Sequence, residues 1–164
     1  MIIRNQAVLD THALDAIVSE PRLFRDVSAA VEAEHLRLLW TEVTFREIAA
    51  LPNLRHRTNL YNFVCSHATL VTPRPPEVSG EEDELTDGAV LDAACYGPPR
   101  DPRGAVLVAA AVLARGVICT RDRKLALRAR LSQVQAVRPE NLVQWASPVA
   151  VPRADAPTLF GRRR

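Results

Sequence analysis

The sequence has few cysteines and no long apolar run. Its three cysteines, Cys65, Cys95 and Cys119, lie far apart and form no CxxC pair. Neither a disulfide framework nor a structural zinc site is therefore expected. No apolar run reaches the roughly 18 residues that a membrane helix needs, and residues 1–6 lack the basic-then-apolar layout of a signal peptide. We therefore expect a cytoplasmic protein with no membrane partner.

The chain also has little net charge. Lys and Arg number 21 and Asp and Glu number 19, which gives +2, and Lys124 is the single lysine. Residues 148–164 alone carry +3, so residues 1–147 carry −1. A protein that binds nucleic acid through bulk charge would have a basic body. Any site for a polyanion must therefore be local.

Length and composition predict one folded domain followed by a tail. The 164 residues with 48% hydrophobic content suit a single domain with a buried core. We expect this domain to span residues 1–147. Residues 148–164 contain Pro, Ala and Arg without apolar periodicity, which predicts a disordered basic tail.

Apolar periodicity predicts strands that alternate with helices. Strands are expected at residues 6–9, 35–40, 68–71, 117–120 and 134–137. Helices are expected at residues 11–18, 22–34, 43–51, 55–66, 84–95, 102–115, 123–130 and 139–145, with Gly116 closing the sixth of them. The proline-rich, acidic stretch 72–84 is expected to be a loop. This alternation predicts an α/β fold, a three-layer α/β/α sandwich with a mainly parallel central sheet.

Two of the predicted strands end in a carboxylate. Asp10 follows Val8-Leu9, and Asp122 follows shortly after Cys119. Ligands of open parallel sheets bind beyond the carboxyl ends of the strands, so these acids share a crevice if their strands lie near each other. Both acids also precede predicted helices, and N-capping is the alternative role for each.

Two further acids are candidates. Glu47 lies within helix 43–51 near its core-facing side, with Glu42 as the alternative, and Asp101 begins helix 102–115. This position puts Asp101 at the opposite edge of the sheet unless its loop bends over. Clustered carboxylates repel one another unless a hard cation such as Mg²⁺ or Mn²⁺ lies among them. Such an arrangement suits metal-assisted hydrolysis of phosphodiester bonds.

Four segments, taken in order, resemble the PIN domains, a ribonuclease fold with an acidic site. They are residues 8–14 (VLDTHAL), 40–52 (WTEVTFREIAALP), 100–110 (RDPRGAVLVAA) and 117–122 (VICTRD). The Arg-Asp-Pro stretch is similar to the PIN subfamily of bacterial toxin–antitoxin toxins. Over residues 6–145 the resemblance implies a PIN-like fold and an Mg²⁺- or Mn²⁺-dependent endoribonuclease. It also implies single-stranded or structured RNA as substrate, with an antitoxin protein and a second copy of the chain as partners.

The resemblance also implies which residues act. Asp10, Glu47, Asp101 and Asp122 would be the catalytic acids, and all of these except Glu47 would be metal ligands. Thr11 and Thr120 would be hydroxyls supporting those ligands. Independently of the resemblance, the position of Arg121 and Arg123 on either side of Asp122 suits phosphate contacts, with solvated side chains as the equal alternative.

The sequence departs from the family pattern at one important position. Gly104 stands where the subfamily has a second acid, and Ala105 stands where other PIN branches have their third. The alternative function is therefore a catalytically degenerate PIN module that binds RNA or a protein without cleavage. A phosphatase of the haloacid-dehalogenase type is disfavoured. Its chemistry resembles an Asp-x-Asp pair at the end of the first strand, whereas here Thr11 and His12 follow Asp10.

Overall fold

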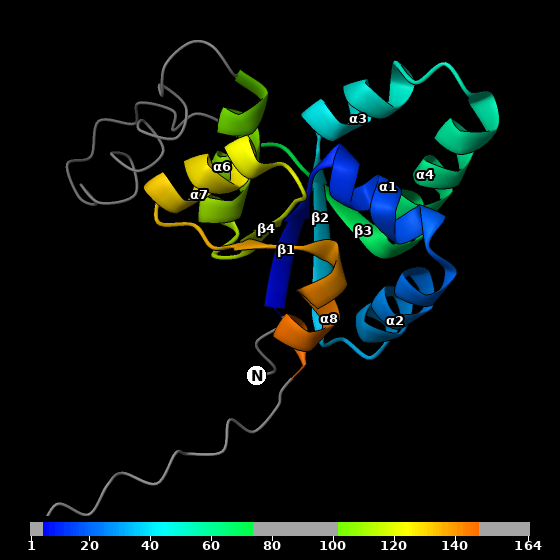
Figure 1. Ribbon diagram of the computed structural model, residues 1–164, viewed down its shortest axis with the longest axis horizontal. Helices are drawn as coiled ribbons and strands as arrows, with labels where there is room; N and C mark the ends of the chain where they lie inside the picture. Colours follow the sequence, from blue (N-terminus) through cyan, green and yellow to red (C-terminus); the bar gives the residue numbers. More distant parts are fainter. Residues whose placement is uncertain (1–4, 74–101, 148–164) are drawn as a thin grey trace, which may run out of the picture.

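A computed structural model describes residues 5–73 and 102–147 of the chain (Figure 1). The strands are β1 (Asn5–Leu9), β2 (Leu36–Thr41), β3 (Ala68–Val71), β4 (Val117–Cys119) and β5 (Ala136–Val137). The helices are α1 (Thr11–Ser19), α2 (Pro21–Glu32), α3 (Glu42–Ala49), α4 (Leu54–His67), α6 (Pro102–Leu113), α7 (Arg123–Leu131) and α8 (Pro139–Ala146). The helix expected at 84–95, most of the loop at 72–84, Asp101 and the tail at 148–164 lie outside the described residues.

Several helix ends differ from the sequence prediction. Helix α2 begins at Pro21, whose ring suits the first helical turn, and ends at Glu32 because Glu34 takes a left-handed backbone with φ 61°. Arg115, with φ 50°, ends α6 in the same way, so the prediction that Gly116 closes this helix was wrong. Gly116 is instead required by close packing, because a Cβ there would lie 2.4 Å from the Gln6 carbonyl oxygen.

All five strands form one parallel sheet in the order β3-β2-β1-β4-β5. The first strand of the chain lies at its centre, between β2 and β4 (Figure 1). Each parallel connection requires a crossover, and helices supply these crossovers where the connection is described. The sheet therefore has two faces that helices must cover.

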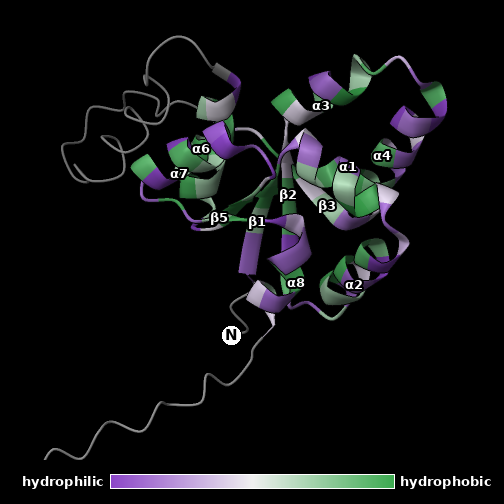
Figure 2. Cartoon of the chain, in the orientation of Figure 1, coloured by the Kyte–Doolittle hydropathy of each residue, from purple (hydrophilic) through white to green (hydrophobic). Residues whose placement is uncertain are grey.

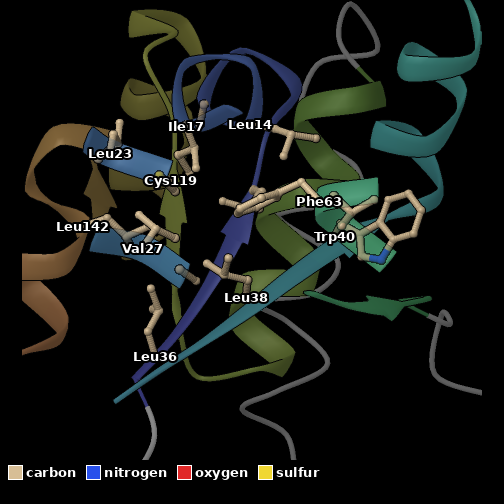
Figure 3. Packing of buried hydrophobic residues seen from close by; sticks show 14 of the residues in the cluster. Leu14, Ile17, Leu23, Val27, Leu36, Leu38, Trp40, Phe63, Cys119 and Leu142 are labelled. Atoms are coloured by element: carbon tan, nitrogen blue, oxygen red, sulfur yellow. The ribbon is translucent and has the colours of Figure 1, made fainter. Parts of the chain in front are cut away.

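Side chains alternate between two hydrophobic clusters on opposite faces of this sheet. Leu9, Leu38 and Cys119 belong to a cluster with residues of α1, α2, α4 and α8 (Figure 3). Val8 and Ile118, each next in sequence to one of these, belong to a second cluster with α6 and α7. From Ala105 onward α6 consists only of Ala, Val and Leu (Figure 2), which suits a helix packed closely on the sheet. The predicted three-layer α/β/α sandwich is confirmed.

The helices are short. In the part of the chain that the structure describes, none has the length and apolar character needed to cross a bilayer.

Candidate active site

The strand register brings Asp10 and Thr120 together. Leu9 pairs with Cys119 in the parallel ladder between β1 and β4, so the residue after each strand lies at the same edge of the sheet. The backbone N–H of Asp10 donates to the Cys119 carbonyl at 3.2 Å, which continues the pairing by one step. The two strands that end in carboxylates are therefore direct neighbours.

Asp10 is a buried carboxylate with a partner on each oxygen. Only 4% of the surface of Asp10 is exposed to solvent. Oδ1 accepts from the Ala13 backbone N–H at 2.6 Å and so caps α1, while Oδ2 accepts from the Thr120 hydroxyl. The capping role therefore occurs, and the same carboxylate also faces the strand-end crevice.

Thr120 links the two strand-end acids. Its hydroxyl donates to Asp10 and accepts from the backbone N–H of Asp122 at 2.9 Å. Asp122 in turn caps α7, because its Oδ1 accepts from the Lys124 backbone N–H at 2.7 Å. One buried hydroxyl thus sets the spacing between the Asp10 carboxylate and the backbone that carries Asp122.

Glu47 reaches the same edge from α3. The Thr44 hydroxyl donates to the Leu9 carbonyl at 3.2 Å, which fixes α3 to the end of β1, and Glu47 lies one turn further on the same helix face. Its carboxylate accepts from the Thr11 hydroxyl and from Arg103 Nη1, the latter at 3.1 Å. Glu42, the alternative acid, is exposed and pairs with Arg46 on its own helix.

One open cavity of about 650 Å³ brings these side chains together. Its lining includes three acids from three separate elements, the hydroxyl-bearing Thr11 and basic side chains from α6 and α7. The acids are Asp10, Glu47 and Asp122, and the basic residues are Arg103, Lys124 and Arg128. The remaining lining is His12, Gly104, Leu107, Leu125, Leu127 and Leu131.

The basic residues at this cavity differ from those expected. Arg121 pairs with Glu140 on α8, and neither Arg121 nor Arg123 is part of the cavity lining. Arg103, Lys124 and Arg128 line it instead, and Arg103 contacts one of the acids, Glu47. Arg103 belongs to the Arg-Asp-Pro-Arg stretch, but no pattern in the sequence showed that the first turn of α6 would reach Glu47.

The electrostatics of the site are those of crowded carboxylates. Burial raises the pKa of Asp10 above its ordinary value of 3.8, and the charge of Asp122 adds to this rise. The bonds from Thr120 and Ala13 and the charge of His12 act in the opposite direction. Ionisation of Asp10 in the folded protein therefore costs free energy, and a nearby cation would reduce this cost.

The chemistry of the donors fits a hard divalent cation. The acids and the Thr11 hydroxyl in the cavity lining present only oxygen atoms, which Mg²⁺ and Mn²⁺ prefer. In residues 5–73 and 102–147, however, no three His, Cys, Asp or Glu side chains lie close enough to hold one ion together. Because Mg²⁺ keeps several of its waters, Asp10 and Asp122 would suffice as its protein ligands.

Acidification tests the burial of Asp10. Because its pKa is raised in the folded protein, its contribution to stability is fully present below pH 3.8 and is lost as the pH rises through the folded-state pKa. We expect the free energy of unfolding of wild type, relative to that of Asp10→Asn, to fall as the pH rises from 3.8 through the raised pKa of Asp10. Urea denaturation of both proteins in EDTA measures this difference, and a gain over the same interval would contradict the assignment.

Comparison with known proteins gives one structural likeness to report. No protein-family model and no curated protein matches the sequence. Among solved structures, the chain is similar to a PilT N-terminus domain protein from the hyperthermophilic archaeon Sulfolobus solfataricus P2, with a TM-score of 0.45 and 12% sequence identity. That alignment covers 87% of this chain and 94% of the archaeal one.

Proposed function

We propose that this protein is a metal-dependent ribonuclease of the PIN type, which hydrolyses phosphodiester bonds in RNA. One observation chiefly supports the proposal. Asp10, Glu47 and Asp122, which the resemblance singles out as acids, line one cavity although they come from the N-cap of α1, from α3 and from the N-cap of α7. Asp101, the fourth acid of the proposal, immediately precedes α6, whose first turn carries the cavity residue Arg103.

Each residue would have a distinct task in this chemistry. Asp10 and Asp122 would hold the cation, with Asp101 as a further ligand, and the Thr120 hydroxyl keeps the first two in register. When bound, Mg²⁺ or Mn²⁺ would lower the pKa of a water and offset charge on the phosphate. Glu47, oriented by Thr11, would accept a proton from the attacking water.

The charge distribution favours local binding of a nucleic acid at the cavity. Residues 1–147 carry a net charge of −1, so the whole surface does not attract a polyanion. Basic side chains nevertheless line the acidic cavity itself, where Arg103 and Lys124 would bind phosphate oxygens. Phosphate recognition would therefore occur at the reacting group.

Binding of Mn²⁺ and cleavage of RNA test the proposal together. Loss of an outer partner of a metal ligand costs about 10–100-fold in affinity or activity, so Asp122→Asn, which removes a ligand, is expected to weaken Mn²⁺ binding by at least about 100-fold. Asparagine caps a helix as well as aspartate does, so α7 is expected to remain intact. Isothermal titration with Mn²⁺ and cleavage of a single-stranded oligoribonucleotide with Mg²⁺ or Mn²⁺ provide the measurements.

Asp15→Asn is the matched control for this experiment. Asp15 lies on α1 and pairs with His56 at 2.9 Å, and it is not part of the cavity lining. This variant is expected to bind Mn²⁺ and cleave RNA as wild type does. Equal Mn²⁺ affinity in wild type and Asp122→Asn would contradict the proposed metal site.

A degenerate PIN module is the second candidate function. Gly104 lies in the cavity lining where the resemblance calls for an acid, and no group of three metal-binding side chains occurs within the described ranges. Such a module would bind the oligoribonucleotide but leave it intact with either metal. The cleavage assay therefore separates the two candidates.

We further propose that the ribonuclease acts as the toxin of a toxin–antitoxin pair, capped by an antitoxin protein and able to form a homodimer. This finer role is supported by the likeness of Arg100-Asp101-Pro102 to the toxin subfamily. A reading frame for a small antitoxin next to this gene is the expected genomic arrangement. A gene with no such neighbour would count against the toxin role but not against RNA cleavage.

A further inference from the structure

The side chain of Arg103 pairs with Glu47. Arg103 Nη1 lies 3.1 Å from Glu47 Oε1, while the Thr11 hydroxyl donates to Glu47 Oε2. Both carboxylate oxygens of Glu47 therefore have a partner. The Arg103 side chain is 71% exposed and that of Glu47 is 28% exposed, so the contact lies at the mouth of the site.

This ion pair stands between two cavities. The cavity that holds the acids adjoins a second cavity of about 660 Å³. Both are lined by Thr11, His12, Glu47 and Arg103. The second cavity continues along α3 and α6, over Val43, Leu51 and Val106. A strand whose phosphate lay at the acids and whose chain continued into the second cavity would pass directly along Arg103.

The charge of Arg103 opposes that of a cation at the acids. Its guanidinium compensates the charge of Glu47, and a divalent cation near Asp10 and Asp122 would repel the same guanidinium. An exposed ion pair of this kind favours the paired state by no more than about fivefold, so it breaks easily. Phosphate oxygens offer a guanidinium the same two-pronged recognition as a carboxylate does.

We propose that Arg103 exchanges partners during the reaction: it pairs with Glu47 before substrate binds and moves to a phosphate of the nucleic acid once the cation and the substrate are bound. This inference rests on the proposed function. It makes Arg103 a residue that contacts the substrate and that also weakens cation binding until the substrate is present. The two effects have opposite signs, which makes the inference testable.

The first measurement is Mn²⁺ binding to the RNA-free protein by isothermal titration. Arg103→Gln removes the competing charge and is expected to tighten Mn²⁺ binding by about three- to tenfold. Arg46→Gln is the matched control, because Arg46 lines the second cavity and pairs with a glutamate, but that glutamate is Glu42, outside the site. Arg46→Gln is expected to change the Mn²⁺ affinity by less than about twofold.

The second measurement is RNA binding in Mn²⁺ at several salt concentrations. The probe is a fluorescent 2′-O-methyl oligoribonucleotide, followed by anisotropy, with its integrity checked on a denaturing gel. Loss of one phosphate contact lowers the slope of log affinity against log salt by about 0.7 on a single strand, and we expect this change in Arg103→Gln. Arg103→Lys keeps the charge and is expected to retain both the wild-type slope and the wild-type Mn²⁺ affinity.

The outcomes separate this inference from the proposed function. If wild type binds Mn²⁺ and Arg103→Gln binds it no more tightly, or if the salt slope is unchanged, the exchange is overturned while the metal site stands. If neither wild type nor Arg103→Gln binds Mn²⁺, the proposed function itself is overturned. Tighter Mn²⁺ binding in Arg103→Gln but not in Arg46→Gln, together with a reduced salt slope in Arg103→Gln, supports the exchange.

Discussion

Replacing Asp10 by Asn is expected to reduce RNA cleavage by about 10²–10³-fold, because the variant loses an anionic ligand whose cation contributes several kcal/mol to the barrier reduction. The fold is expected to survive. Asn caps α1 as well as Asp does, and its amide can still contact the Thr120 hydroxyl. Single-turnover cleavage of an oligoribonucleotide, with thermal unfolding of the same samples, measures both properties.

The stability of this variant carries information of its own. Burial and the charge of Asp122 both raise the pKa of Asp10, so an uncharged side chain at this position removes a repulsion. We therefore expect Asp10→Asn, in EDTA, to unfold at the same temperature as wild type or higher. If Asp10→Asn loses both cleavage and the folded state, Asp10 acts as the cap of α1 and its assignment as a metal ligand is contradicted.

Thr120→Val is expected to destabilise the protein by about 2–4 kcal/mol and to weaken Mn²⁺ binding by about 10–100-fold. Valine has nearly the same shape as threonine but cannot replace the hydroxyl. Asp10 Oδ2 loses its donor, and the Asp122 N–H loses its acceptor, in a position that is 3% exposed. Urea denaturation and Mn²⁺ titration measure the two effects.

Thr120→Ser is the matched control, since serine keeps the hydroxyl and loses only a methyl group. It is expected to bind Mn²⁺ as wild type does, with a stability loss of about 1 kcal/mol for the buried methyl. If Thr120→Val and Thr120→Ser bind Mn²⁺ equally well, the hydroxyl does not align Asp10 with Asp122.

The local pattern of the sequence was sufficient to predict most elements of the fold. The apolar run before Asp10 became β1, and the buried run before Thr120 became β4, because strands buried on both faces need continuous apolar residues. Helix ends were harder to predict. Helix α6 ends because Arg115 takes a left-handed backbone conformation. Gly116 is needed for close packing against Gln6, so predicting it as the residue that ends the helix was wrong.

The site was predictable where side chains follow strand ends. Asp10 and Asp122 are close because β1 and β4 are neighbours, and the sequence could state that only as a condition. The contact between Glu47 and Arg103 depends on how α3 and α6 pack, which no short-range pattern encodes. Arg121 could equally have faced the cavity, but Glu140 on α8 offers it a partner elsewhere.

The central position of β1 has a consequence for synthesis of the protein. Residues 7–9 pair with residues 117–119, so the cavity cannot close until the far end of the domain has left the ribosome. A nascent chain that ends before Asp122 lacks both the neighbouring strand and one of the acids. The proposed ribonuclease would therefore stay inert beside the messenger that encodes it until translation of its domain is nearly complete.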